Sequence, residues 1–136
     1  MDLDRFVDAQ AGTYDRALGE LRAGRKTGHW MWWVFPQLAG LGASPTSQAY
    51  AVRDLTEATA YVRHEVLGPR LLECCRALLD LGGVSAERVL GSVDAMKLRS
   101  SMTLFAHADP SETTFREVLD RYYDGAEDGR TVAMLA

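Results

Sequence analysis

The sequence predicts an all-α fold, a compact single-domain bundle of about five to seven helices that spans residues 1–136, with an aromatic-rich segment after the first helix. Apolar side chains recur at helical spacing along almost the whole chain, and no convincing strand alternation interrupts them. Glycine and proline residues separate the helical segments. With 47% hydrophobic and 25% charged residues, the chain has enough apolar material for one buried core.

The first predicted helix covers residues 3–22 and ends at Gly24. Its apolar positions fall on one side of the helix: Phe6, Val7, Tyr14, Ala17, Leu18 and Leu21. Gln10 lies in the middle of this apolar stripe, where its amide must find partners or cost about 1–3 kcal/mol. Gln10 therefore either bonds a neighbouring backbone group in the core or faces a ligand from the wall of a pocket.

Residues 37–53 are predicted to form a loop up to Asp54, because their content of glycine, proline, serine and threonine is typical of one. Asp54 and Glu57 resemble a capping box at the start of a short helix that ends near Arg63. Further helices are predicted over residues 69–81, 85–91, 94–108 and 112–123. Helix 69–81 is apolar over half its circumference, so we expect it to be central.

Composition excludes several classes of partner. A formal charge of -4 argues against nucleic acid, because binding several phosphates requires an excess of clustered Lys and Arg. No apolar run approaches the roughly 18 residues that a bilayer span needs, and the N-terminus lacks a signal pattern, so we expect a cytoplasmic protein without membrane contact.

The cysteine and histidine pattern predicts neither a cofactor nor a metal. Cys74 and Cys75 are adjacent within a helical pattern and are interpreted as reduced core residues. His29, His64 and His107 are far apart in the sequence, and no ligand spacing of the CxxC or HxxxH kind is present.

All three tryptophans lie in GHWMWWVFPQ, residues 28–37. The run from Trp30 to Phe35 is apolar on every side, whether it is wound as a helix or extended. Three interpretations remain open: a core plug that Pro36 ends, a pocket wall that offers flat rings beside the proton-transfer group of His29, or an exposed patch that binds another protein.

A second polar constellation occurs in DAMKLRSSMTLF, residues 94–105. Helical spacing directs Leu98, Met102 and Phe105 to the core and places Asp94, Lys97 and Ser101 in a strip beside them. Lys97 could then bind the phosphate or carboxylate of a ligand. The alternative is a simple structural ion pair between Asp94 and Lys97 at a spacing of three residues.

The sequence resembles a known family. The pattern FVDAQ...Y..AL.EL..G.K..HWMWWVFPQL.GLG.S..S..YAV, then EA..YV.H..LG.RL, D.MKLRSSMTLF, F..VLD and DGRTVAML, is similar to domain of unknown function 1810 from about Phe6 to Leu135. The resemblance implies a compact all-α domain and no established activity. Some members carry the label calpastatin, which helical patterning of this kind does not support, since that inhibitor is repetitive and disordered. A shorter likeness, in D..K..SSM and F..VL, is to the NADAR group that processes ADP-ribose; it covers about a tenth of the chain and transfers no residue roles.

We therefore expect an uncharacterised protein with a small-molecule pocket for a nucleotide-like or ADP-ribose-like ligand, where the two segments above meet at a single concave site. The expected lining is Gln10, His29, Trp30, Trp32, Trp33, Tyr50, Lys97 and Ser101. If the protein is an enzyme, we expect a hydrolase acting on an N-glycosidic or nucleotide-type substrate, with His29, Asp94 and Lys97 as candidate catalytic groups and Asp94 as base. The alternative function is a protein–protein interaction module with an aromatic surface and no catalysis. The oligomeric state is not predicted.

Overall fold

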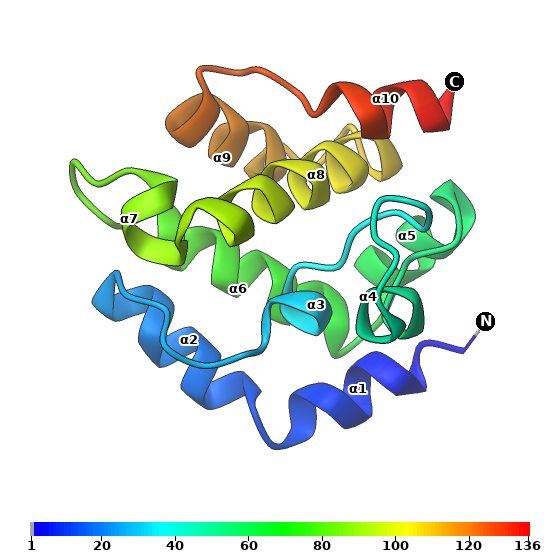
Figure 1. The fold of residues 1–136 in the computed structure, drawn as a ribbon, viewed down its shortest axis with the longest axis horizontal. Coiled ribbons are helices and arrows are strands. Elements are labelled where there is room, and N and C mark those ends of the chain that lie inside the picture. The colour runs from blue at the N-terminus through cyan, green and yellow to red at the C-terminus, as the bar shows by residue number, and fades with distance from the viewer. Residues whose placement is uncertain (1) are drawn as a thin grey trace.

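The computed structural model describes residues 2–136, and every regular element in this range is a helix (Figure 1). The ten helices are α1 (Asp4–Ala11), α2 (Tyr14–Ala23), α3 (Met31–Val34), α4 (Pro45–Ala49), α5 (Leu55–Arg63), α6 (Leu67–Leu79), α7 (Ala86–Leu90), α8 (Ser92–Ala108), α9 (Thr114–Tyr123) and α10 (Gly129–Leu135). An isolated parallel bridge between Leu38 and Val52 is the sole β-type pairing in residues 2–136. The predicted all-α class is confirmed.

The predicted count of five to seven helices was too low. One reason is that the helix expected over residues 3–22 is broken between α1 and α2, at Gly12 and Thr13. Glycine is unfavourable inside a helix, and the Thr13 hydroxyl donates a hydrogen bond of 2.8 Å to the carbonyl of Ala9. The apolar spacing runs through the break without interruption, so periodicity alone indicated one helix.

The other additional helices, α3, α4 and α10, are short, and α3 has only four residues. In α4, within the predicted loop, Ser44 caps the helix by accepting a hydrogen bond of 3.1 Å from the Ser47 amide, and Pro45 occupies the first turn. In α10, Asp128 caps the helix by accepting a hydrogen bond of 3.0 Å from the Thr131 amide. Helices of five and seven residues are too short for a periodic apolar pattern to reveal them.

The longer helices agree with their predicted ranges to within a few residues. Asp54 accepts a hydrogen bond of 2.9 Å from the Glu57 amide, which confirms the predicted N-cap of α5. Ser85 caps α7 in the same way, by accepting a hydrogen bond of 3.1 Å from the Arg88 amide. The left-handed Gly24, with φ of 75°, ends α2 where the sequence indicated.

Helix α6 lies in the middle of the molecule and packs against α2, α5 and α9 (Figure 1). Its side chains Leu71, Cys74, Cys75 and Leu78 are buried, which confirms its central position. Both thiols are free and fully buried, and burial raises the pKa of Cys74 to about 12. Helix α8 packs across α5, α7 and α9 and carries α10 on its far side.

Within residues 2–136, no helix combines the length and the apolar character that crossing a bilayer requires.

The first turn of α6 contains a glycine that the packing requires. A Cβ at Gly68 would lie 2.1 Å from the carbonyl oxygen of Val62, which is a backbone atom that cannot rotate away. Gly68→Ala should therefore lower the free energy of unfolding by about 1–3 kcal/mol through overpacking. Urea unfolding followed by circular dichroism measures the change.

Gly19, in the exposed face of α2, provides the matched control, because no heavy atom lies within 4 Å of its Cβ position. Gly19→Ala should raise the free energy of unfolding by about 0.5–1 kcal/mol through helix propensity. Equal effects of the two substitutions would contradict the proposed packing at Gly68.

Candidate functional site

The three tryptophans of residues 28–37 do not act as one unit. Trp30 is 1% exposed, and its indole N–H donates a hydrogen bond of 2.9 Å to Glu20. The Trp33 indole donates one of 2.9 Å to the Thr13 hydroxyl. Trp32 points elsewhere and lines a surface cleft with two lobes, which share Trp32, Gln37 and Gly42. The aromatic block is thus partly core and partly cleft wall.

The larger lobe, called here the cationic lobe, encloses about 230 Å³. Its charged lining residues are Lys97, Arg99, Asp128 and Arg130. Its other lining residues are Trp32, Gln37, Leu41, Gly42, Val93, Met96 and Ser100. Three cations face one carboxylate in this lobe, although the whole chain has a net charge of -4.

One face of α8 forms the cationic lobe. Met96 and Lys97 each lie three or four residues from both Val93 and Ser100, so the four side chains share a side of the helix. Val93 is 66% exposed and Met96 is 72% exposed. The opposite side of α8, with Leu98, Met102 and Phe105, is fully buried as predicted.

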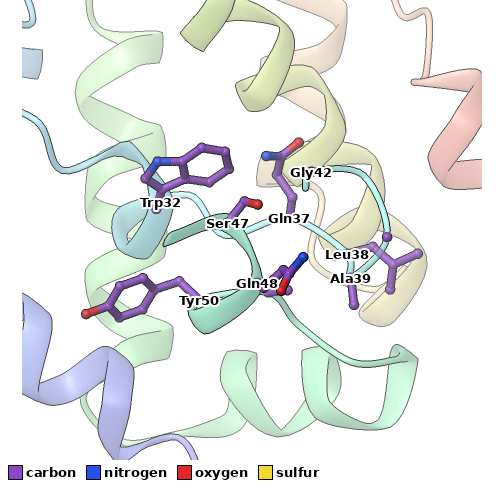
Figure 2. Close-up of a pocket in the computed structure, with 10 residues that line it drawn as sticks. Trp32, Gln37, Leu38, Ala39, Gly42, Ser47, Gln48 and Tyr50 are labelled. Atoms are coloured by element: carbon purple, nitrogen blue, oxygen red, sulfur yellow. The ribbon is translucent and has the colours of Figure 1, made fainter. Parts of the chain in front are cut away.

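The smaller lobe, called here the neutral lobe, encloses about 110 Å³ and has no charged side chain in its lining. It lies between the 37–42 segment and α4, as Figure 2 shows for Trp32, Gln37, Ser47 and Tyr50. The backbone pairing of Leu38 with Val52 holds the start of the 37–42 segment against the chain that follows α4, through hydrogen bonds of 2.7 and 2.8 Å.

An ion triad fixes Lys97 in the cleft. The carboxylate of Asp94 lies 2.8 Å from the Nζ of Lys26 and 3.0 Å from the Nζ of Lys97. The same Lys97 Nζ lies 3.8 Å from the centre of a Trp32 ring, in a cation–π contact. Partial burial by itself raises the pKa of Asp94, but hydrogen bonds and positive charge from the two lysines outweigh it and hold the pKa below its ordinary value.

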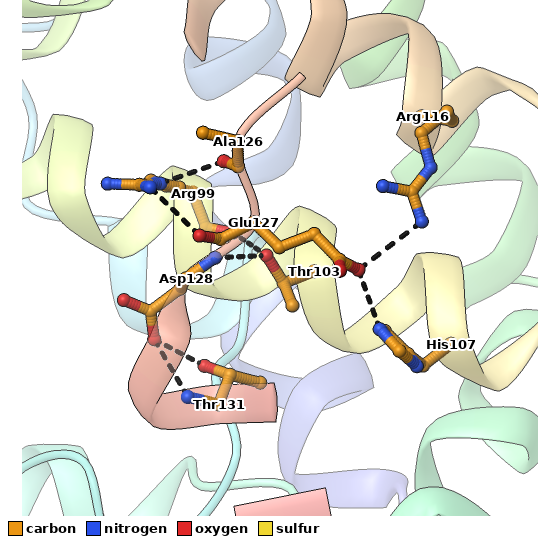
Figure 3. A network of polar contacts seen from close by, with 8 residues as sticks. All are labelled: Arg99, Thr103, His107, Arg116, Ala126, Glu127, Asp128 and Thr131. Atoms are coloured by element: carbon orange, nitrogen blue, oxygen red, sulfur yellow. Dashed lines mark hydrogen bonds and ion pairs between the residues drawn. The ribbon is translucent and has the colours of Figure 1, made fainter. Parts of the chain in front are cut away.

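Hydrogen bonds from α8 position the C-terminal segment beside the cationic lobe (Figure 3). Arg99 donates to the carbonyls of Ala126 and Glu127 at 2.9 and 2.8 Å, and the Asp128 amide donates to the Thr103 hydroxyl at 2.9 Å. The Glu127 carboxylate contacts His107 at 2.6 Å and Arg116 at 3.3 Å. These contacts place Asp128 and Arg130 at the cleft.

The structure brings together three of the candidate lining residues, Trp32, Tyr50 and Lys97, so the two sequence segments do meet in one concave region. The others lie outside the lining of both lobes: Gln10, His29, Trp30, Trp33 and Ser101.

Trp30 and Trp33 make the indole hydrogen bonds described above, and the other three residues outside the lining lie in different surroundings. The Gln10 amide is buried and donates to the Trp33 carbonyl at 2.8 Å and to the Tyr61 hydroxyl at 3.1 Å, so it is not on the cleft wall. His29 is exposed on the loop before α3. Ser101 is fully buried, and its hydroxyl has no hydrogen-bond partner among residues 2–136.

Sequence reasoning missed Gln37, Met96, Arg99 and Arg130. Met96 had a usable signal, because Val93 and Met96 form a second apolar stripe on a helix whose core face is already provided by Leu98 and Met102. Arg99 and Arg130 gave no such signal, since an exposed arginine on a helix is ordinary.

No group of three or more His, Cys, Asp or Glu residues in the described range is close enough together to hold a metal ion.

The fold and the cleft define a small all-α protein with a surface cleft that cationic and aromatic side chains line. The chain matches the family model described as "Protein of unknown function (DUF1810)" over residues 1–135, and it belongs to that family. Among solved structures, it is similar to the conserved hypothetical protein Rv1873 from Mycobacterium tuberculosis, with 54% identity and a TM-score of 0.97. The match covers 98% of this chain and 96% of the mycobacterial one. A search of curated proteins found no match.

Glu20, near the end of α2, holds the loop that leads to the tryptophans. One carboxylate oxygen accepts hydrogen bonds from the Thr27 and Gly28 amides, at 2.7 and 2.8 Å, and from the Trp30 indole. The other accepts one of 3.0 Å from Arg16. Burial alone would raise the pKa of Glu20, but these hydrogen bonds outweigh it and lower the pKa from 4.5 to about 2.

A carboxyl group whose pKa is lowered by folding stabilises the protein above its unfolded pKa and loses that contribution as the pH falls. At about pH 6, Glu20→Gln should lower the free energy of unfolding by about 1.5–3 kcal/mol, the range for hydrogen bonds to a charged group. The difference from the wild type should shrink as the pH falls from 4.5 toward 2. Urea unfolding at several pH values measures it.

Glu87→Gln, at an exposed position on α7, is the control and should leave stability nearly unchanged at every pH. A difference between Glu20→Gln and the wild type that stays constant down to pH 2.5, about the lower end of this window, would contradict the lowered pKa.

Proposed function

We propose that this protein binds a small anionic ligand with a flat ring, of nucleotide-like or ADP-ribose-like kind, in the cleft at Trp32. The observation that carries the proposal is the charge of the cationic lobe, where Lys97, Arg99 and Arg130 converge. Phosphate groups are the ligand chemistry that lysine and arginine clusters recognise best.

The three cations differ in the ion pairs and hydrogen bonds that they already make within the protein. Arg99 donates to two backbone carbonyls, and Lys97 is paired with Asp94. Arg130 is exposed at the cleft and makes neither an ion pair nor a side-chain hydrogen bond with residues 2–136. The Asp128 carboxylate accepts hydrogen bonds from the amide and the hydroxyl of Thr131, at 3.0 and 2.6 Å. This carboxylate is therefore already bonded as the N-cap of α10. Arg130 is thus the cation most available to an anion.

Apolar surface beside the cations supports a ring-bearing ligand. Trp32 separates the two lobes, and Val93 and Met96 leave most of their surface in contact with water next to Lys97. Covering such side chains is favourable by about 25 cal/mol for each Å² of apolar area. A ligand that joins a phosphate to a flat heterocycle satisfies both kinds of surface.

The geometry at Asp94 favours binding over hydrolysis. Both carboxylate oxygens contact lysines, and the pKa is lowered, so the group is a weak proton acceptor in this arrangement. Asp94 lines neither lobe, and its ion pair with Lys97 holds that lysine in place from outside the cleft lining. We therefore assign it a positioning role.

A second function, docking of another protein, is favoured by a separate observation. Val93, Met96 and Met134 are the large apolar side chains that stay exposed within residues 2–136. The Met134 methyl lies against Gly40 of the neutral lobe, so all three surround the same cleft. The ligand titration below distinguishes this function, because docking through apolar side chains does not require a bound phosphate.

Isothermal titration with adenosine 5′-monophosphate, ADP-ribose and uncharged adenosine tests the proposal. The two anions should bind more tightly than adenosine, and Arg130→Ala should weaken their binding by about tenfold, the effect of one charge-assisted contact. Lys97→Ala should act in the same direction. Stability should change little for Arg130→Ala, because the side chain has no partner to lose.

Arg88→Ala removes an exposed cation of α7 that lies outside both lobes, and it should leave affinity unchanged. Failure of both anions to bind, or equal weakening by Arg88→Ala and Arg130→Ala, would count against a site in this cleft.

A further inference from the structure

Gln37 lies at the junction of the two lobes and lines both of them. Its backbone is fixed, since its carbonyl accepts a hydrogen bond of 2.8 Å from the Val52 amide and the buried Pro36 precedes it. Figure 2 shows its side-chain amide projecting beside the Trp32 ring. The cleft thus presents a half-buried amide from a rigid stretch of backbone.

The Gln37 side-chain amide has no hydrogen-bond partner within the described residues, unlike the other glutamines. The chain has three glutamines, and the other two use their amides internally: Gln10 donates to Trp33 and Tyr61, and Gln48 donates to the Ala43 carbonyl at 3.1 Å. The Gln37 amide makes no hydrogen bond to any of residues 2–136. A partly buried amide without a partner gains free energy from a ligand that supplies one.

The chemistry of an amide defines what that partner must carry. A glutamine side chain presents one donor and one acceptor side by side, which matches a heterocycle edge that has an adjacent acceptor and donor, such as the N7 and N6 edge of adenine. The neutral lobe offers no charged side chain that would compete for this edge, and Trp32 supplies an apolar surface next to it.

We propose that Gln37 reads the base edge of a nucleotide whose phosphate lies in the cationic lobe. This inference rests on the proposed function and narrows it: the ligand class is nucleobase-containing anions, and sugar phosphates or simple carboxylates lack the group that Gln37 recognises. Gln37 is then the specificity-determining residue, and Arg130 contributes to the affinity for any anion of this size.

Two probes separate the two contributions. Adenosine 5′-monophosphate carries both the base and the phosphate, whereas ribose 5-phosphate carries only the phosphate. Wild-type protein should bind the nucleotide more tightly than the sugar phosphate in isothermal titration. Gln37→Met keeps a similar side-chain volume without hydrogen-bonding groups, and it should weaken binding of the nucleotide by about tenfold or more while leaving the sugar phosphate unchanged.

Arg130→Ala is the matched contrast and should weaken both probes by similar factors. Urea unfolding of Gln37→Met should match the wild type, because the amide has no internal bond to lose; Gln37→Ala repeats the test if the methionine variant is destabilised. If Gln37→Met and Gln37→Ala bind the nucleotide as tightly as the wild type, or weaken both probes equally, Gln37 does not read a base, although the cleft still binds anions. If wild-type protein binds neither probe, the proposed function and this inference are both wrong.

Discussion

The cleft depends on the carboxylate of Asp94, which lies between the ammonium groups of Lys26 and Lys97. The lysine side chains are only 9% and 18% exposed, and charges with so little access to water need a counter-charge close by. Lys26 follows α2, and Asp94 lies in the first turn of α8, so the triad joins segments that are distant in the sequence. It also fixes Lys97 above Trp32, and this contact forms the side of the cleft nearest to α3.

The four-residue helix α3 explains how three tryptophans from one short stretch serve different purposes. Neighbouring residues on a helix point about 100° apart, so Trp32 and Trp33 project from different sides of α3. Trp33 faces the break between α1 and α2, where Thr13 accepts its indole N–H and Gln10 donates to its carbonyl. Trp32 faces α8 instead. The apolar pattern, which is continuous in the sequence, therefore contributes to the core and to the cleft at once.

The sequence predicted the helices that apolar periodicity and capping residues mark. It predicted little of how side chains from different helices come together. Helices with strong periodicity and a capping side chain, such as α5 after Asp54, were placed closely. Helix α10 was missed because Thr131 is its sole buried side chain, so no apolar stripe marks it. Among the residues that line the cleft, Trp32 and Lys97 were expected from the sequence because their surroundings there are unusual. Arg130 was not, because what distinguishes it is its position against α8.

The net charge of -4 and the cationic lobe are compatible, since they describe the molecule at different scales. A deficit of basic residues opposes a long phosphate-binding surface, where many contacts add up. A small anion interacts mainly with charges within about 8–10 Å, the screening distance at physiological salt. The local excess of positive charge in the cationic lobe depends on Arg99. Its hydrogen bonds to the carbonyls of Ala126 and Glu127 hold the segment that leads into α10 against α8. The guanidinium that lines the lobe thus also brings Arg130 to it.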